Sequence, residues 1–237
     1  GESFVPREEL AEQRADDDSI FAFPRGAAPG TFLHDVLEHL DFPLITREPD
    51  TVQQLIEKKL AQHGFALKWR DAVMTMIIDV LATPLLPDRQ DLVLQAITVD
   101  KRLNELEFCF PLAAVSAARI KEILAAYGFS ESAASSLEFS VGNGFLKGFI
   151  DLVFAHNGRF YLVDWKSNHL GFKVADYHQD RLQEVMLQER YTLQYLLYTV
   201  ALHHYLAQRI TDYSYEDHFG GLFYLFLRGV SRQHGPL

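Results

Sequence analysis

The sequence has little cysteine, no long apolar run and no excess of positive charge. Cys109 is the only cysteine, which excludes an internal disulfide and a cysteine-based zinc site and fits a reducing cytoplasm. No apolar run approaches the roughly 18–20 residues of a membrane span. The 22 basic residues against 32 acidic ones give a net charge of −10, so the chain is not expected to coat DNA mainly by charge.

Two sequence signals are also missing at the level of motifs. The opening residues lack the basic-then-apolar pattern of a signal peptide. No G-x-x-x-x-G-K-[ST] loop is present, so we expect no ATPase activity. The chain begins with Gly rather than Met, which suggests a piece excised from a longer protein.

The composition that remains is that of a globular domain. Hydrophobic residues make up 48% of the 237 residues and aromatic residues 13%. Residues 1–24 carry seven acids against two arginines and weak periodicity, so we interpret them as an acidic linker arm from a preceding region. Residues 25–237 form the expected domain. An acidic domain can still act on nucleic acid where metal ions neutralise its site and another domain delivers the substrate.

The periodicity predicts a mixed α/β domain with a central sheet. Thr31 is the expected N-cap of a helix TFLHDVLEHL, in which His34 is the third residue. Apolar spacing predicts further helices, and alternation or continuous apolar runs predict strands. The expected helices are 69–81, about 120–128 and about 180–208, and the expected strands are 105–112, 137–141, 145–154, 160–166 and 220–229.

Asp151 is an anomaly because it lies inside the apolar strand GFIDLVF. A buried carboxylate costs several kcal/mol unless it is paired or bound to metal. A salt bridge to a neighbouring Lys or Arg explains it as well as a functional role does.

Asp164 and Lys166 end the strand YLVDWK and project from one face because they are two residues apart. The two groups could simply pair with each other. However, Asp164 follows Asp151 by 13 residues across a predicted hairpin, which can bring two carboxylates together beside an ammonium. Such a trio suits metal-assisted phosphodiester hydrolysis, since Mg²⁺ takes oxygen ligands and relieves the repulsion between carboxylates. The backbone carbonyl of Trp165 is a further candidate ligand, and Lys166 could orient water or stabilise charge on phosphorus.

Other polar residues are ambiguous by themselves. Gln194 and Tyr198 are four residues apart on one helical face, but a Tyr/Leu stripe at that spacing is usually core. His34 alone is more often structural than a ligand. Glu105 and Glu107 alone fit a solvated strand face.

Taken together, the motifs GFIDLVF, LVDWKSN-x-LG, Q-x-x-x-Y, G-T-x-x-H and E-x-E-F resemble those of RecB-type nucleases of the PD-(D/E)xK superfamily, over about residues 25–230. The resemblance implies a restriction-endonuclease-like fold, α/β, with a central mixed β-sheet flanked by helices. It makes Asp151, Asp164 and Lys166 catalytic. It assigns the metal to His34, Asp151, Asp164 and the Trp165 backbone carbonyl. The residue between Asp164 and Lys166 is more often Tyr in this family than Trp. The supporting residues it implies are Glu105, with Glu107 competing, and Gln194 and Tyr198.

The resemblance also implies an activity and partners. The expected activity is hydrolysis of single-stranded DNA, dependent on Mg²⁺ with Ca²⁺ or Mn²⁺ as alternative occupants, as a helicase in the same parent chain unwinds a duplex. The expected partners are RecC and RecD subunits and the RecA recombinase, in double-strand-break repair by homologous recombination and degradation of foreign DNA. The alternatives are a catalytically silent module that docks RecA or RecC, and a stand-alone exonuclease.

Overall fold

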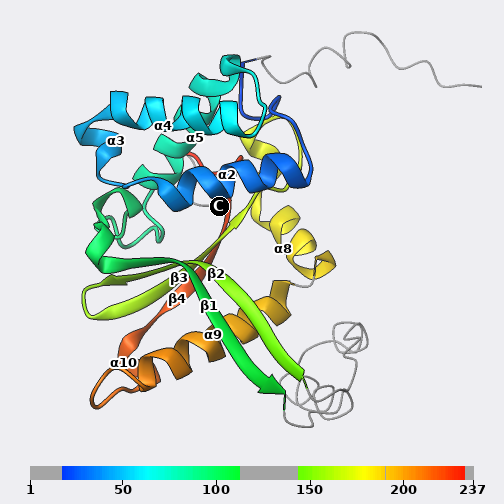
Figure 1. Cartoon of the computed structure of the whole chain (residues 1–237). Coiled ribbons are helices and arrows are strands. Elements are labelled where there is room, and N and C mark those ends of the chain that lie inside the picture. Colours follow the sequence, from blue (N-terminus) through cyan, green and yellow to red (C-terminus); the bar gives the residue numbers. More distant parts are fainter. Residues whose placement is uncertain (1–17, 113–143, 190, 233–237) are drawn as a thin grey trace, which may run out of the picture.

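The computed structural model describes residues 18–112, 144–189 and 191–232 (Figure 1). At its centre lies a four-stranded sheet in the order β1-β2-β3-β4. The β1–β2 and β2–β3 pairs are antiparallel and the β3–β4 pair is parallel, which confirms the predicted mixed sheet. The strands are β1 Arg102–Leu112, β2 Gly144–His156, β3 Arg159–Lys166 and β4 Phe219–Phe226.

The β2–β3 hairpin is closed by a tight turn. Asn157 and Gly158 both have positive φ, 49° and 77°, as the favoured two-residue hairpin turn requires. This turn fixes the register of the two strands, which determines where their acidic residues meet.

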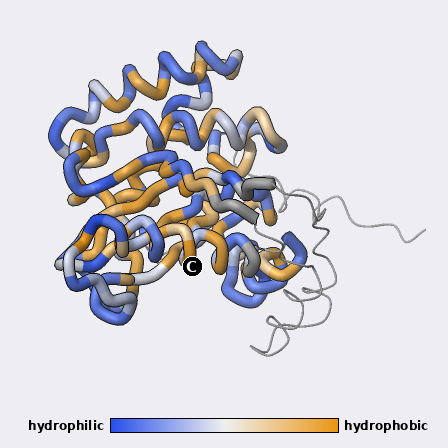
Figure 2. Tube along the Cα trace, turned by 60° about the horizontal axis from the view of Figure 1, so that its bottom comes forward, coloured by the Kyte–Doolittle hydropathy of each residue, from blue (hydrophilic) through white to orange (hydrophobic). Residues whose placement is uncertain are grey.

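Helices cover both faces of the sheet (Figure 1). On one face α2, α4 and α5 form the larger core with Leu152, Val163 and other strand residues. On the other face α9 packs on Ile150, Val153 and Leu162. Along these helices hydrophobic and hydrophilic residues alternate, whereas the strands are mostly hydrophobic (Figure 2). The helices are α2 Ala27–His39, α3 Leu44–Arg47, α4 Pro49–Gln62, α5 Arg70–Ala82, α8 Gln179–Gln188, α9 Tyr191–Ala207 and α10 Tyr215–His218.

Helix α2 begins earlier than the sequence predicted. Its N-cap is Gly26 rather than Thr31, whose hydroxyl donates to the Ala27 carbonyl from inside the helix. Pro29 does not break the helix because it lies in the first turn, where its missing N–H is not needed. His34 is therefore the eighth helical residue and not the third.

The predicted long helix of 180–208 is two helices. Helix α8 packs on Tyr177 and Phe226, whereas α9 packs on the sheet, so the two follow different surfaces. The helix predicted near 120–128 and the strand predicted at 137–141 lie outside the described residues. The helix 69–81 and the strands 105–112, 145–154, 160–166 and 220–229 are confirmed within a few residues.

Of the predicted acidic arm, the structure describes residues 18–24. Ile20 and Phe23 belong to the larger core, with Phe23 only 1% exposed. The buried guanidinium of Arg228 donates to the backbone carbonyls of Ile20, Phe23 and Pro24 and holds this stretch against the domain. Within the described residues, no helix is both long and apolar enough to cross a membrane.

Candidate active site

The hairpin brings Asp151 and Asp164 to opposite positions on neighbouring strands. Leu152 pairs with Val163 at the end of the ladder, so the two acids occupy the next positions. The Trp165 backbone N–H donates to Asp151 Oδ2 at 2.8 Å and fixes that carboxylate. Among the described residues, the ion pair that Asp151 forms is with His34 and not with the lysine or arginine of the alternative interpretation.

His34 reaches the site from α2. Its Nδ1 lies 3.7 Å from Asp151 Oδ1. Burial opposes charge on the imidazole, but its contact with Asp151 and the charges of Asp151 and Asp164 outweigh it and raise the pKa of His34. Helix α2 can lie this close to the end of β3 because residue 30 is glycine: a Cβ there would lie 2.8 Å from Ser167 Oγ.

Glu105 completes an acidic cluster with His34 and Asp151. One ligand atom from each of these three side chains lies within 4.8 Å of the others. Glu105 has φ 49°, a left-handed conformation that costs a non-glycine residue about 1 kcal/mol or more. The residues on either side of it pair with Ile150 and Leu152, which places Glu105 opposite Asp151. Burial and the charge of Asp151 raise the pKa of Glu105.

Glu107, the competing acid, has a different partner. Its carboxylate forms an ion pair with Lys147 at 2.9 Å, and both side chains are about half exposed. The structure therefore brings Glu105, and not Glu107, to His34 and Asp151.

This difference supplies a matched pair of variants. We expect Glu105→Gln to weaken the binding of a divalent cation by about 10-fold or more, because the variant removes a charge from the cluster. Glu107→Gln, two residues away on the same strand, should leave binding unchanged. Calorimetric titration of the metal-free chain with Ca²⁺ measures both, and equal losses in the two variants would contradict the placement.

Asp164 and Lys166 form a buried ion pair. Lys166 Nζ lies 2.5 Å from Asp164 Oδ2, and the two residues are 8% and 3% exposed. Burial and the charge of Asp151 raise the pKa of Asp164 to about 6, against the opposing effect of Lys166. The ion pair between Asp164 and Lys166 that the sequence allowed is therefore present. The nearby carboxylate of Asp151 still repels the charge of Asp164.

Gln194 links Lys166 to Tyr198. Lys166 Nζ donates to Gln194 Oε1 at 2.9 Å, and Gln194 Nε2 donates to the Tyr198 hydroxyl at 2.8 Å. Tyr198 also packs in the core beneath α9, and burial raises the pKa of its hydroxyl. The core interpretation of Tyr198 is therefore confirmed, and the same residue ends a hydrogen-bond chain from Lys166, whereas its supporting role stays a prediction.

The donor set fits a hard divalent cation. One imidazole and the carboxylates of Glu105 and Asp151 gather in a partly buried place, where like charges repel unless a cation or protons intervene. Asp164 is not part of this group, because its carboxylate pairs with Lys166, but the charge of Asp151 still acts on it from the neighbouring strand. The Trp165 N–H donates to Asp151 Oδ2 at 2.8 Å, which puts that backbone segment beside the cluster.

A second acidic group, Asp35, Glu38 and His39, lies on the same helix. Its central carboxylate, Asp35, already accepts from Lys59 Nζ at 2.6 Å and lies 2.8 Å from His63 Nε2. This group is therefore neutralised by the protein itself and is the weaker candidate for a cation.

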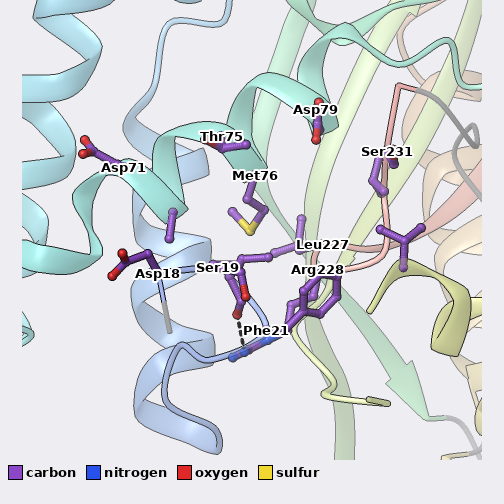
Figure 3. Close-up of a pocket in the computed structure, with 14 residues that line it drawn as sticks. Asp18, Ser19, Phe21, Asp71, Thr75, Met76, Asp79, Leu227, Arg228 and Ser231 are labelled. Atoms are coloured by element: carbon purple, nitrogen blue, oxygen red, sulfur yellow. Dashed lines mark hydrogen bonds between the residues drawn. The ribbon is translucent and has the colours of Figure 1, made fainter. Parts of the chain in front are cut away.

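A cavity of about 360 Å³ lies away from these residues, between residues 18–21, α5 and the segment 227–231 (Figure 3). Two of its three carboxylates have arginine partners: Asp71 pairs with Arg70, and Asp79 with Arg232. None of the sequence-predicted site residues lines this cavity.

The sequence analysis gave no site role to Tyr191, which it placed only in the Tyr/Leu stripe around Gln194 and Tyr198, and it did not identify Tyr224. The Lys166 ammonium lies over the Tyr191 ring, 3.7 Å from its centroid, and 5.1 Å from the centroid of Tyr224. Tyr191 precedes Gln194 by three residues, a helical spacing that places the two on a shared face but does not reveal the contact with Lys166. Tyr224 carried no such signal, because its contact depends on the parallel pairing of β4 with β3.

Comparison with known proteins places the chain in a family. Residues 10–235 match the model of the PD-(D/E)XK nuclease superfamily. The chain is 43% identical over 213 residues to RecBCD enzyme subunit RecB of Escherichia coli, covering 90% of this chain and 18% of that protein. It is 38% identical over 246 residues to the subunit of the same name from Mycobacterium tuberculosis, covering 92% of this chain and 22% of the relative. The chain thus spans about a fifth of the length of these relatives.

Proposed function

The chain belongs to the PD-(D/E)XK nuclease superfamily, as its motifs predicted, and on this premise we propose that it is a Mg²⁺-dependent nuclease domain that hydrolyses phosphodiester bonds in single-stranded DNA. The observation that carries the proposal is the convergence of His34, Glu105 and Asp151, from α2 and two strands, beside the buried pair of Asp164 and Lys166 on the next strand.

His34, Asp151, Asp164 and the Trp165 carbonyl are the proposed ligands of Mg²⁺, or of Ca²⁺ or Mn²⁺ in the same place, with Glu105 in support. A bound divalent cation supplies charge stabilisation to the phosphate and lowers the pKa of a coordinated water. The neutral form of His34 and the ionised forms of the acids are the binding forms, so binding displaces the protons that the raised pKa values of His34 and Asp164 retain.

The remaining residues orient the reacting groups. The Trp165 N–H holds Asp151 in one orientation. Gln194, itself held by Tyr198, directs the Lys166 ammonium along the edge of the site. In that place the ammonium can hold the attacking water or stabilise the negative charge that develops on the phosphate oxygens.

The cellular setting is proposed from the relatives. Their printed names assign them to the RecBCD enzyme, and they are about five times as long as this chain. We propose that this domain is attached to a helicase and works with RecC and RecD subunits on strands released by unwinding, in the cytoplasm. Repair of double-strand breaks by homologous recombination, degradation of foreign DNA and contact with RecA complete the proposal.

Cleavage of a labelled single-stranded oligonucleotide tests the proposal. We expect products with Mg²⁺, none with EDTA, and none from an Asp164→Asn variant that remains folded. If the wild-type chain is inactive, the same assay is repeated on its complex with RecC and RecD. Inactivity of both would instead support the alternative of a nuclease-like docking module. A double-stranded oligonucleotide of the same sequence reports whether unwinding is needed.

A further inference from the structure

The Lys166 ammonium is almost completely removed from water. The residue is 8% exposed, and its Nζ forms an ion pair with Asp164 Oδ2 at 2.5 Å and donates a hydrogen bond to Gln194 Oε1 at 2.9 Å. Two oxygens therefore lie close to the ammonium, and the charge also lies over the Tyr191 ring, 3.7 Å from its centroid.

That ring is held in place from three directions. Tyr191 and Tyr224 stack with centroids 5.6 Å apart and planes 16° apart. The Tyr224 hydroxyl donates to the Tyr191 backbone carbonyl at 2.9 Å, and the Tyr191 hydroxyl donates to Asn168 Oδ1 at 3.3 Å. Helix α9, strand β4 and the segment after β3 thus meet at a pair of rings beside Lys166.

The two tyrosines act as neutral rings. Burial raises the pKa of the Tyr191 hydroxyl, and burial together with the charge of Asp164 raises that of Tyr224. Neither is therefore a phenolate near neutral pH, and their attraction for the ammonium comes from the negative face of the ring. This attraction is strongest where water is excluded, as it is here.

We propose that Tyr191, backed by Tyr224, is a positioning residue that fixes the Lys166 ammonium for phosphodiester cleavage. The inference rests on the proposed function. A lysine held only by Asp164 would follow that carboxylate whenever Asp164 changed partner. The Tyr191 ring and Gln194 hold Nζ independently of Asp164. The ammonium therefore keeps its place when the Asp164 carboxylate binds a cation instead of Lys166.

Kinetics of the 237-residue chain on a single-stranded oligonucleotide with Mg²⁺ test this role. We expect Tyr191→Leu to lower kcat about 10- to 30-fold, the equivalent of a desolvated cation–π contact, with an unchanged KM. Tyr191→Phe keeps the ring and should keep kcat close to that of the wild type. Tyr195→Leu, on the same helix, is the matched control and should behave like the wild type. Equal losses in the Phe and Leu variants, or a rise in KM alone, would overturn the proposal.

A second readout needs neither metal nor activity. In the metal-free wild-type chain, the ε-methylene protons of Lys166 should resonate upfield of ordinary lysines because they lie over an aromatic face, and Lys166→Met assigns the signal. An unshifted signal would overturn the proposed contact between Lys166 and the Tyr191 ring, even if Tyr191→Leu fails to fold. A shifted signal in a wild-type chain that cuts no DNA would show instead that the proposed function, and with it the catalytic role of Tyr191, has failed while the contact itself is present.

Discussion

Replacement of Asp164 by asparagine should lower the rate of DNA cleavage by about 10³-fold or more. The variant removes a charged ligand of the proposed cation, and the cation contributes several kcal/mol of transition-state stabilisation. The metal-free variant should nevertheless remain folded. Asp164 is 3% exposed and carries a charge that burial and Asp151 both disfavour. A steady-state cleavage assay with Mg²⁺, combined with denaturant unfolding without metal, measures both effects. Cleavage within tenfold of the wild type would contradict the assigned role.

The pH dependence of stability provides an independent check on the same residue. The pKa of Asp164 is about 6 in the folded chain against an ordinary 3.8, so the folded state binds the extra proton. Stability from this group is therefore present at low pH and lost as pH rises through about 6. Between pH 5 and pH 8 the wild type should lose about 1–1.5 kcal/mol relative to Asp164→Asn.

The comparison with the variant is necessary because other groups titrate in the same range. The raised pKa of His34 acts in the same direction as Asp164, whereas burial lowers the pKa of His169, which acts in the opposite direction. Parallel pH profiles of the wild type and Asp164→Asn would contradict the raised pKa.

Lys166→Met should lower cleavage by about 10²–10³-fold, the typical cost of removing one group that stabilises the developing charge. Unlike Asp164→Asn, this variant should still bind a divalent cation, because removing the ammonium frees Asp164 Oδ2 for a metal. Calorimetry with Ca²⁺ separates the two variants. The metal-free Lys166→Met chain should be less stable than the wild type, since a buried carboxylate loses its partner, and Ca²⁺ should restore part of that stability.

Loss of Ca²⁺ binding in Lys166→Met would show that the lysine supports the ligands rather than the reaction. Gln194→Leu is a useful companion because it leaves the charge on Lys166 and removes one of the two oxygens that orient it. We expect its effect on cleavage to be smaller than that of Lys166→Met.

The core of the site could be predicted from local sequence because it lies on a hairpin. Strand periodicity and a 13-residue spacing suffice to place Asp151 opposite Asp164, and a two-residue spacing places Lys166 beside Asp164. These relations depend only on the pleat and on a tight turn, both of which are local. The contribution of His34 could be expected only from the combined motifs, since its approach depends on how α2 packs on β3.

Features set by long-range packing or by unusual backbone were not predictable. Alternation along β1 gives Glu105 and Glu107 the same face, and only the left-handed φ of Glu105 distinguishes them. The start of α2 was misplaced because Thr31 was expected to be the N-cap, although the helix begins at Ala27 and tolerates Pro29 in its first turn. The division between α8 and α9 follows from the two surfaces that they cover, which the Leu- and Tyr-rich pattern does not reveal.

The most direct test of the proposed cation site is a crystal of the chain soaked with Mn²⁺. The anomalous signal of Mn²⁺ locates the ion without reference to activity. The expected result is a peak ligated by His34, Asp151 and Asp164, with Glu105 and the Trp165 carbonyl at its edge. A peak at Asp35, Glu38 and His39 instead, or none at His34 at saturating Mn²⁺, would contradict the proposed catalytic centre.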